Sequence, residues 1–361
     1  MKRALPALII GCACVVLAVA CKFQDPTVEE YATGLTNPRG LAFGPDGNLY
    51  VAEAGTGGDW VPTDEPGCPR DINIFSPYTA GLTGKIARVL ADGTTQTVVD
   101  GLPSMSEASG ASYGPTDIAF IGKTLYVLIE MGGCSHGLPD DLNLPAILRV
   151  NKDGTTTNVA DLGAWHRANP PVFVTPGDRT TTDQEPGGVF HSMIAIDDRL
   201  YVVETNRGFL LRVNPANGVI EKLYDMSSDL AEHNPVVMVR KDKRFYVGTF
   251  GDDGGPAELA VFDKHFSGYT EPFEAIQPLT GLAWSGNTLY GIEIFPHDEA
   301  WSPDNANLVS FDPKSGKRTE ILTDFASFPN GLIVGPDGAL YTSNQALTFE
   351  PGDGSILRIS R

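Results

Sequence analysis

The chain has 361 residues, of which 42% are hydrophobic and 20% are charged, and its formal net charge is −19. A chain of this length can bury a sizeable core. Its acidic balance argues against a nucleic-acid partner and against a surface that binds anionic lipid headgroups, although it suits cations and keeps a protein soluble.

Residues 1–20 are typical of a secretory signal peptide, because a short basic head precedes the apolar run Leu5–Ala20. That run is too short to form a spanning helix. It ends in LAVAC, which is similar to the lipobox of bacterial lipoproteins, although Ala18 stands where Leu is commonest. We therefore expect export to the cell envelope (periplasm or cell surface), lipidation of Cys21, and a tether at 21–27 that makes the lipid the only membrane anchor. Ordinary cleavage nearby is the alternative.

The rest of the chain, 28–361, repeats one pattern of two strands joined by a Gly- or Asp-containing turn. The first copy is GLAFGPDGNLYVAE at 40–53, and the last is GLIVGPDGALYTSN at 331–344. From the third copy onward the spacing is roughly 45–50 residues, the length of a four-stranded propeller blade. Six copies predict an all-β, six-bladed β-propeller of the NHL/TolB-like kind. The copies are marked by Tyr50, Tyr126, Tyr201, Tyr246, Tyr290 and Tyr341.

A second pair of strands follows each copy, with Asp-Gly or Asn-Gly turns that are typical of hairpins. The last unit stops after its third strand, GSILRISR. The segment Val28–Thr33 resembles the fourth strands of other units, so we expect it to pair with Ser355–Ile359 and close the ring.

Long insertions interrupt the connections that leave one face of the predicted ring. Loops on a rigid scaffold usually carry function, so we place the site on this decorated face, at the mouth of the central channel. Three tryptophans in these loops, Trp60 among them, could stack on a planar ligand or could anchor the loops themselves. The insertions are Ala54–Thr83, Met131–Pro145, Gly163–Val189 and Ile294–Asn305, and the other two tryptophans are Trp165 and Trp301.

Two cysteines, Cys68 and Cys134, remain after the signal peptide and Cys21 are set aside. They fall in loops of adjacent blades on the same face. An even pair in an exported chain predicts a disulfide. No Cys or His spacing indicates a zinc site.

The best polar group of side chains stands where the first strand of each blade begins. It consists of Arg39, Asp117, His191 and Asn330, with Thr280 as a weaker member. Strand starts converge on the channel mouth, so these residues are the candidate ligand-binding set, with Trp60 as a cover. We expect Arg39 to anchor an anionic or phenolate group of the ligand, and Asp117 to hold Arg39 in place or to receive a ligand hydroxyl. His191 is the member of the set that can exchange a proton near neutral pH. The alternative is that they satisfy loop backbone and channel water.

Glutamates recur three residues after the marker tyrosine, at Glu53, Glu204 and Glu293, and Glu130 lies one position further along its strand. Recurrence at one blade position favours a structural role, in which the carboxylate holds the end of the strand to its neighbour.

The remaining motifs give weaker predictions of function. GASYG at 110–114 matches the G-x-S-x-G pattern, but it precedes a strand and no helix follows, so it is not a nucleophile elbow. The acidic stretches GDDGG and PHDEAWSPDN could hold calcium through oxygen ligands, without an EF-hand pattern. We assign no metal ligands and no cofactor.

The stretches NPRGLAFGPDGNLYVAEAGTGGD, GLPS, YGPTDIAF and GFLLRVN resemble the ScyD/ScyE family, exported NHL-type six-bladed propellers named from the gene cluster for the pigment scytonemin. The resemblance covers Tyr31 to the end and is most specific in the first two blades. It implies the fold, export and involvement with an aromatic metabolite. It offers no catalytic residues to carry over.

Two enzyme families with propeller folds share fragments of the pattern. Asn330 looks like the channel asparagine of gluconolactonase-like, metal-dependent lactonases, but Arg39 stands where they have an aspartate. The LAFGPDGNLYVAE line is similar to that of quinone-dependent sugar dehydrogenases, whose His-Asn-Gly-Gly signature is absent. The sequence therefore favours an exported, lipid-anchored propeller that binds a small molecule or a protein partner. The alternative is an exported enzyme of either kind acting on a sugar or aromatic compound.

Overall fold

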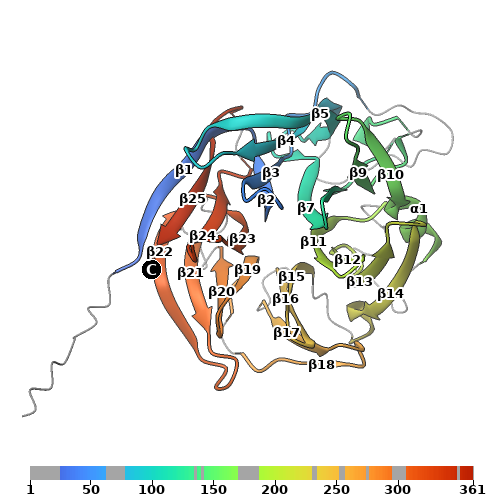
Figure 1. The fold of residues 1–361 in the computed structure, drawn as a ribbon. Coiled ribbons are helices and arrows are strands. Elements are labelled where there is room, and N and C mark those ends of the chain that lie inside the picture. Colours follow the sequence, from blue (N-terminus) through green and yellow to red (C-terminus); the bar gives the residue numbers. More distant parts are fainter. Residues whose placement is uncertain are drawn as a thin grey trace, which may run out of the picture.

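The structure is a computed structural model of the chain. It describes residues 25–61, 78–133, 136–139, 142–169, 187–229, 234–251, 257–273, 276–294, 306–347 and 350–360. Six small antiparallel sheets stand around a common axis, which confirms the predicted six-bladed β-propeller (Figure 1). No helix within these residues has the length and hydropathy needed to cross a membrane.

The first three blades follow one another in chain order, each beginning with the strand nearest the axis (Figure 1). Their strands are β2 (Pro38–Phe43), β3 (Leu49–Glu53), β4 (Thr79–Val89), β5 (Thr95–Ser106) and β6 (Ser112–Tyr113) in blade 1; β7 (Pro115–Ile121), β8 (Thr124–Ile129), β9 (Ala146–Val150) and β10 (Thr156–Asp161) in blade 2; and β11 (Phe190–Ile196), β12 (Arg199–Glu204), β13 (Phe209–Asn214) and β14 (Val219–Asp225) in blade 3.

The last three blades complete the circle in the same way. Their strands are β15 (Pro235–Lys241), β16 (Arg244–Thr249), β17 (Leu259–Asp263) and β18 (Tyr269–Thr270) in blade 4; β19 (Leu279–Ser285), β20 (Thr288–Glu293), β21 (Ala306–Phe311) and β22 (Arg318–Ala326) in blade 5; and β23 (Asn330–Val334), β24 (Leu340–Asn344), β25 (Gly354–Ser360) and β1 (Thr27–Leu35) in blade 6.

The N-terminal strand closes the ring as predicted. β1 runs antiparallel to β25, with Val28 opposite Ile359 and Ala32 opposite Ile356 (Figure 1). The guanidinium of Arg358 adds an ion pair with Glu29 across the two strands, at 2.5 Å. The first and last strands, β1 and β25, thus share one blade, and the ring has no open edge between them.

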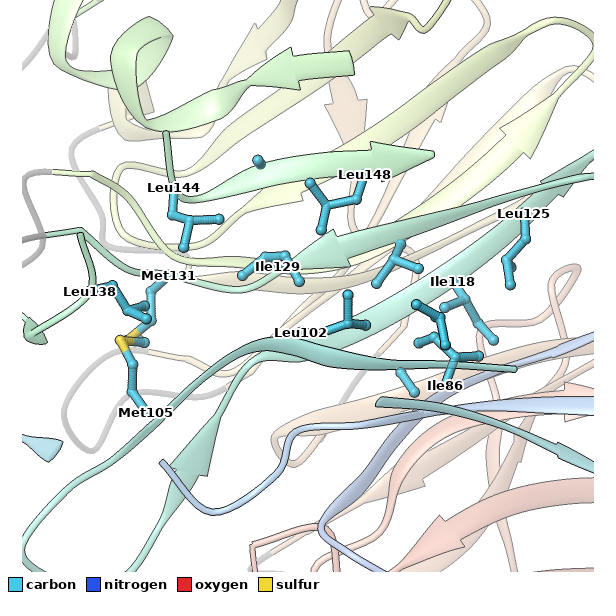
Figure 2. Close-up of a cluster of buried hydrophobic side chains, with 14 of the residues drawn as sticks. Ile86, Leu102, Met105, Ile118, Leu125, Ile129, Met131, Leu138, Leu144 and Leu148 are labelled. Atoms are coloured by element: carbon cyan, nitrogen blue, oxygen red, sulfur yellow. The ribbon is translucent and has the colours of Figure 1, made fainter. Parts of the chain in front are cut away.

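The core consists of six apolar clusters, each shared by two neighbouring blades. Side chains alternate between the two faces of a strand, so Val202 packs toward blade 2 while Val203 packs toward blade 4. Figure 2 shows the cluster between blades 1 and 2, where Ile86 and Leu102 meet Ile118. Burial between blades is therefore what holds the ring together.

The repeated tyrosine of the sequence pattern packs between blades. The ring of Tyr50 lies edge-on to Phe120 of blade 2, with centroids 5.0 Å apart, and Tyr341 meets Phe43 of blade 1 in the same way at 5.3 Å. Edge-to-face aromatic pairs add to the stability gained by burial alone. The first and last copies of the pattern are alike because each supplies such a contact to the next blade.

Two features differ from the simplest interpretation of the sequence. The segment Leu162–Ala168 forms a helix, α1, whose N-cap Asp161 accepts a hydrogen bond from the Ala164 N–H at 2.8 Å. Helical periodicity is hard to see over seven residues, so the cap is the better signal. In addition, β4 starts at Thr79, inside a stretch that we assigned to the long insertion.

Candidate functional site

A cavity of about 410 Å³ lies in the central channel, and the innermost strands of all six blades line it. Its polar wall is formed where those strands begin, and its remaining wall is mostly aliphatic and aromatic. Four of the five predicted site residues line it, together with Thr280, and the described starts of three loops on the decorated face contribute Phe250, Ile294 and Leu347. The four are Arg39, Asp117, His191 and Asn330.

The starts of the inner strands share a register irregularity, although in blade 2 the extra residue is Thr116 and not Asp117. In blades 3, 4 and 5, one extra residue opposes the second strand just after the first pair, and it is His191, Val236 and Thr280 respectively. A bulge of this kind re-aims a side chain. In blade 1 the corresponding irregularity lies between Pro38 and Leu41 and contains Arg39. The irregularity thus recurs at the polar end of the channel.

His191 is held by a buried carboxylate that the sequence analysis did not include in the site. Its Nδ1 lies 3.1 Å from Oε1 of Glu130, whose side chain is fully buried, while a quarter of the His191 side chain remains exposed. Burial by itself raises the pKa of Glu130, but the charges of Arg39 and His191 outweigh it, and the pKa lies below its ordinary value. The carboxylate is therefore ionised at neutral pH.

Arg39 is more deeply buried than the prediction of a ligand anchor requires. Only 3% of the residue is exposed, and its Nη2 donates to the carbonyl oxygen of Ser112 at 2.5 Å. Its guanidinium also lies 6.0 Å from the ring centroid of Tyr113. The Nε of Arg39 has no hydrogen-bond partner among the described residues. The main electrostatic effect of Arg39 is to balance Glu130 rather than to offer a free fork of donors to the cavity.

Asp117 does not hold Arg39 in place, which was one of its predicted roles. Its carboxylate accepts hydrogen bonds from the N–H groups of Ile118 at 2.8 Å and of Met193, in blade 3, at 2.7 Å. Burial outweighs these bonds and raises the pKa of Asp117 to about 7. Asp117 is partly exposed and lines the cavity.

Glycine on the neighbouring strand makes room for this carboxylate. A Cβ atom on Gly40 would lie 2.2 Å from Oδ1 of Asp117. The two residues come from blades 1 and 2, and the hydrogen bond to Met193 extends the contact to blade 3. Asp117 thus contacts blades 1 and 3 in addition to lining the cavity.

The remaining polar groups at this end of the cavity are uncharged. The Oγ1 of Thr280 is buried without a hydrogen-bond partner in the described part of the chain. The backbone of Asn330 pairs with Ser343, while no hydrogen bond of its side-chain amide occurs within the described residues. Both groups can therefore serve a ligand or water.

Several predicted features lie elsewhere or outside the described residues. Trp60 does not line the cavity: it forms an isolated bridge with Ala80 and is 39% exposed, so its predicted role as a cover for the ligand is not supported by its position. Cys21, Cys68 and Cys134 lie outside the described residues, so lipidation and the disulfide stay predictions.

The two acidic stretches considered for calcium also fall largely outside the described ranges. Across the residues that the structure does describe, no group of three or more His, Cys, Asp or Glu side chains is placed to hold a metal ion.

The recurrent glutamates have the structural role that was predicted for them. Glu53 accepts from the Thr36 N–H at 2.6 Å, and Glu204 accepts from the N–H groups of Asn206 and Arg207 at 2.9 Å. Glu293 forms an ion pair with the guanidinium of an outer-strand arginine at 2.5 Å. All three carboxylates are fully buried and tie strand ends to neighbouring segments.

Glu130 differs from these three because it stands one position further along, just past the end of β8. That offset is the one sequence signal that could have separated it from the structural glutamates. The offset carboxylate meets His191 of the next blade. Its proximity in space to Arg39 has no counterpart in the sequence.

Comparisons with known proteins support the fold and no finer assignment. No family model matches the chain, and no curated protein matches it. Among solved structures, the chain is similar to a protein from Thermus thermophilus described as an oxidoreductase (glucose dehydrogenase), at 17% identity and a TM-score of 0.54, covering 93% of this chain and 100% of that one.

Two further structures are similar over the same share of this chain, 93%. One is the PQQ-bound form of an aldose sugar dehydrogenase from Streptomyces coelicolor, at 14% identity and a TM-score of 0.51, with 98% of that chain covered. The other is a protein of unknown function from Bacteroides thetaiotaomicron, at 12% identity and a TM-score of 0.50, with 76% of that chain covered. At such identities the likeness establishes the β-propeller fold alone.

Proposed function

We propose that the protein binds a small, uncharged and largely apolar organic molecule in the cavity of the central channel, without catalysis. The observation that carries this proposal is the cavity itself. Its volume of about 410 Å³ falls within the range of small-molecule sites, and such sites combine an apolar wall with a few converging polar groups. A group with a strongly shifted pKa, Asp117, on the wall of the cavity adds support.

The charges around the cavity favour an uncharged ligand. Glu130 is ionised and the nearby charge of Arg39 balances it, so the two residues together add little net charge to the site. An anion would also meet the carboxyl of Asp117, and any ion loses its hydration on entering an apolar channel. The sequence-based expectation that Arg39 anchors an anionic or phenolate group is therefore replaced by binding of a neutral molecule.

Calorimetric titration with three probes tests this proposal. We expect naphthalene to bind, and 2-naphthoate, which adds a carboxylate to the same scaffold, to bind at least about tenfold more weakly, equivalent to about 1.4 kcal/mol. Ala195→Phe places a ring in the cavity wall and should abolish naphthalene binding. Val219→Phe, on an outer strand where Val219 is 58% exposed, is the matched control and should bind like the unaltered protein. Equal binding by both variants would contradict the proposal.

The enzyme alternative has one observation in its favour, the imidazole of His191 beside a buried carboxylate. Pyrroloquinoline quinone, the cofactor of one structural neighbour, carries three carboxylates. Among the described residues that line the cavity, arginine or lysine is represented by Arg39 alone, and Asp117 adds a negative group. The described wall does not fit this cofactor. Incubation with the quinone and calcium, followed by dye reduction on an aldose panel, separates the two functions: turnover would favour the enzyme.

We also propose that the protein is exported and held to a membrane by a lipid on Cys21, on the strength of the sequence pattern alone. Metabolic labelling with an alkyne-tagged fatty acid should mark the protein, and Cys21→Ser should abolish the label. Labelling that persists in the variant would exclude this anchor.

A further inference from the structure

The starting point is the state of the carboxylate behind His191. Glu130 is fully buried, lies near the cation of Arg39 and has a lowered pKa. An ionised carboxylate offers acceptors only. The Nδ1 atom of His191 lies 3.1 Å from Oε1 in an ion-pair contact, and it must carry a proton to face an ionised carboxylate favourably at this distance. The buried pair thus selects one tautomer of the ring.

The consequence appears at the opposite edge of the ring. In a neutral imidazole whose Nδ1 carries the proton, Nε2 carries a lone pair and accepts hydrogen bonds. No hydrogen bond of Nε2 occurs within the described residues, while His191 lines the cavity. An acceptor is therefore left on the cavity side.

Resting on the proposed binding function, we propose that Nε2 of His191 accepts a hydrogen bond from a hydroxyl group of the ligand, with Glu130 and Arg39 as positioning residues. The ligand class is then an alcohol or phenol whose remaining surface is apolar, because the rest of the cavity wall is aliphatic and aromatic. Thr280 and Asn330, without side-chain partners in the described chain, stand at the same polar end.

Three probes of one shape test the inference on the full protein: 2-naphthol, 2-methoxynaphthalene and naphthalene. Methylation removes the donor and keeps the oxygen. We expect 2-naphthol to bind about tenfold more tightly than 2-methoxynaphthalene, the effect of one hydrogen bond to a buried acceptor that is otherwise unsatisfied. In His191→Phe this ratio should fall to about one. Glu130→Gln should reduce the same ratio, because the amide no longer imposes the tautomer.

A second measurement needs no substitution in the binding protein. Long-range ¹H–¹⁵N spectra distinguish the two tautomers of histidine, and the His191 signals are identified by their loss in His191→Phe or by sequential assignment. We expect the Nδ1–H form in the free protein. The Nε2–H form would overturn the inference, even if the variants fail to fold.

The outcomes separate this inference from the proposed function. If naphthalene binds and 2-naphthol and 2-methoxynaphthalene bind equally, the cavity is a ligand site and the hydroxyl inference is wrong. If none of the probes binds, the proposed function fails and the inference fails with it. If His191→Phe still binds 2-naphthol about tenfold more tightly than 2-methoxynaphthalene, another group accepts the hydrogen bond from the hydroxyl.

Discussion

Replacing Asp117 by asparagine is expected to remove a pH dependence of stability that this carboxyl produces. The pKa of Asp117 rises from 3.8 to about 7 in the folded protein, chiefly through burial. Between these two values the folded protein holds a proton that the unfolded chain has released. The free energy of unfolding therefore falls as the pH rises through this window, and it levels off above pH 7.

The size of the effect follows from the shift. Each unit of pKa corresponds to about 1.4 kcal/mol. A change of the pKa from 3.8 to about 7 therefore alters the contribution of Asp117 to the free energy of unfolding by about 4 kcal/mol between these two pH values. Between pH 5 and pH 8 this contribution changes by about 3 kcal/mol. Asparagine has the shape of the carboxyl without the titration, so the free-energy difference between Asp117→Asn and the unaltered protein should change by that amount, in favour of the variant at high pH.

Urea unfolding at pH 5, 6, 7 and 8 measures this difference, because the many other carboxyl groups titrate alike in both proteins and cancel. Asp92→Asn is the control: Asp92 is a surface turn residue whose pKa is lowered by hydrogen bonds from Thr94, so it is ionised throughout this range in both states. A difference for Asp117→Asn that stays constant within about 0.5 kcal/mol would refute the reasoning.

Three further predictions concern the scaffold. Leu35→Ala should lower the free energy of unfolding by about 2–4 kcal/mol in urea titrations, because this 1%-exposed side chain belongs to the strand that closes the ring; a change below about 1 kcal/mol would contradict that role. Gly40→Ala should cost about 1–3 kcal/mol or more, since its Cβ would clash with Asp117, and an unchanged melting temperature would show that the contact is loose. Cys68 and Cys134 should resist alkylation until a reductant is added, as judged by intact mass, whereas two freely alkylated thiols would exclude the disulfide.

The sequence predicts the ring well because its information is local and repeated. Copies of a strand–turn–strand pattern, with turn glycines such as Gly47 and Gly338 at positive φ, define each blade without reference to distant residues. The missing strand after β25 and the orphan segment at β1 then leave one way to close the circle.

The candidate site is predicted only in part, for a physical reason. Strand starts converge on the axis, so the position of Arg39, Asp117, His191 and Asn330 around one cavity follows from the repeat. Which neighbour each side chain contacts depends on strand bulges and on packing between blades. The spacing of the repeats does not encode these features, so it could not predict the pairing of His191 with Glu130.

The partners of buried charged side chains are equally hard to predict from the sequence. Arg39 looks like a free anchor in the sequence, but in the structure it bonds to the carbonyl of Ser112 and balances a buried carboxylate. Trp60 is placed in a loop of the expected face, yet its backbone forms a bridge with Ala80 of β4 and its side chain does not line the cavity. Aromatic content of a loop says little about where its side chains lie.

A crystal structure of the protein soaked with 2-bromonaphthalene would show whether the channel cavity binds a small uncharged molecule. Anomalous scattering locates the bromine independently of the rest of the map. We expect a bromine peak in the channel, enclosed by the inner strands between His191 and Val334. An empty channel at a probe concentration that calorimetry shows to be saturating, or a bromine peak only on the outer surface, would contradict it.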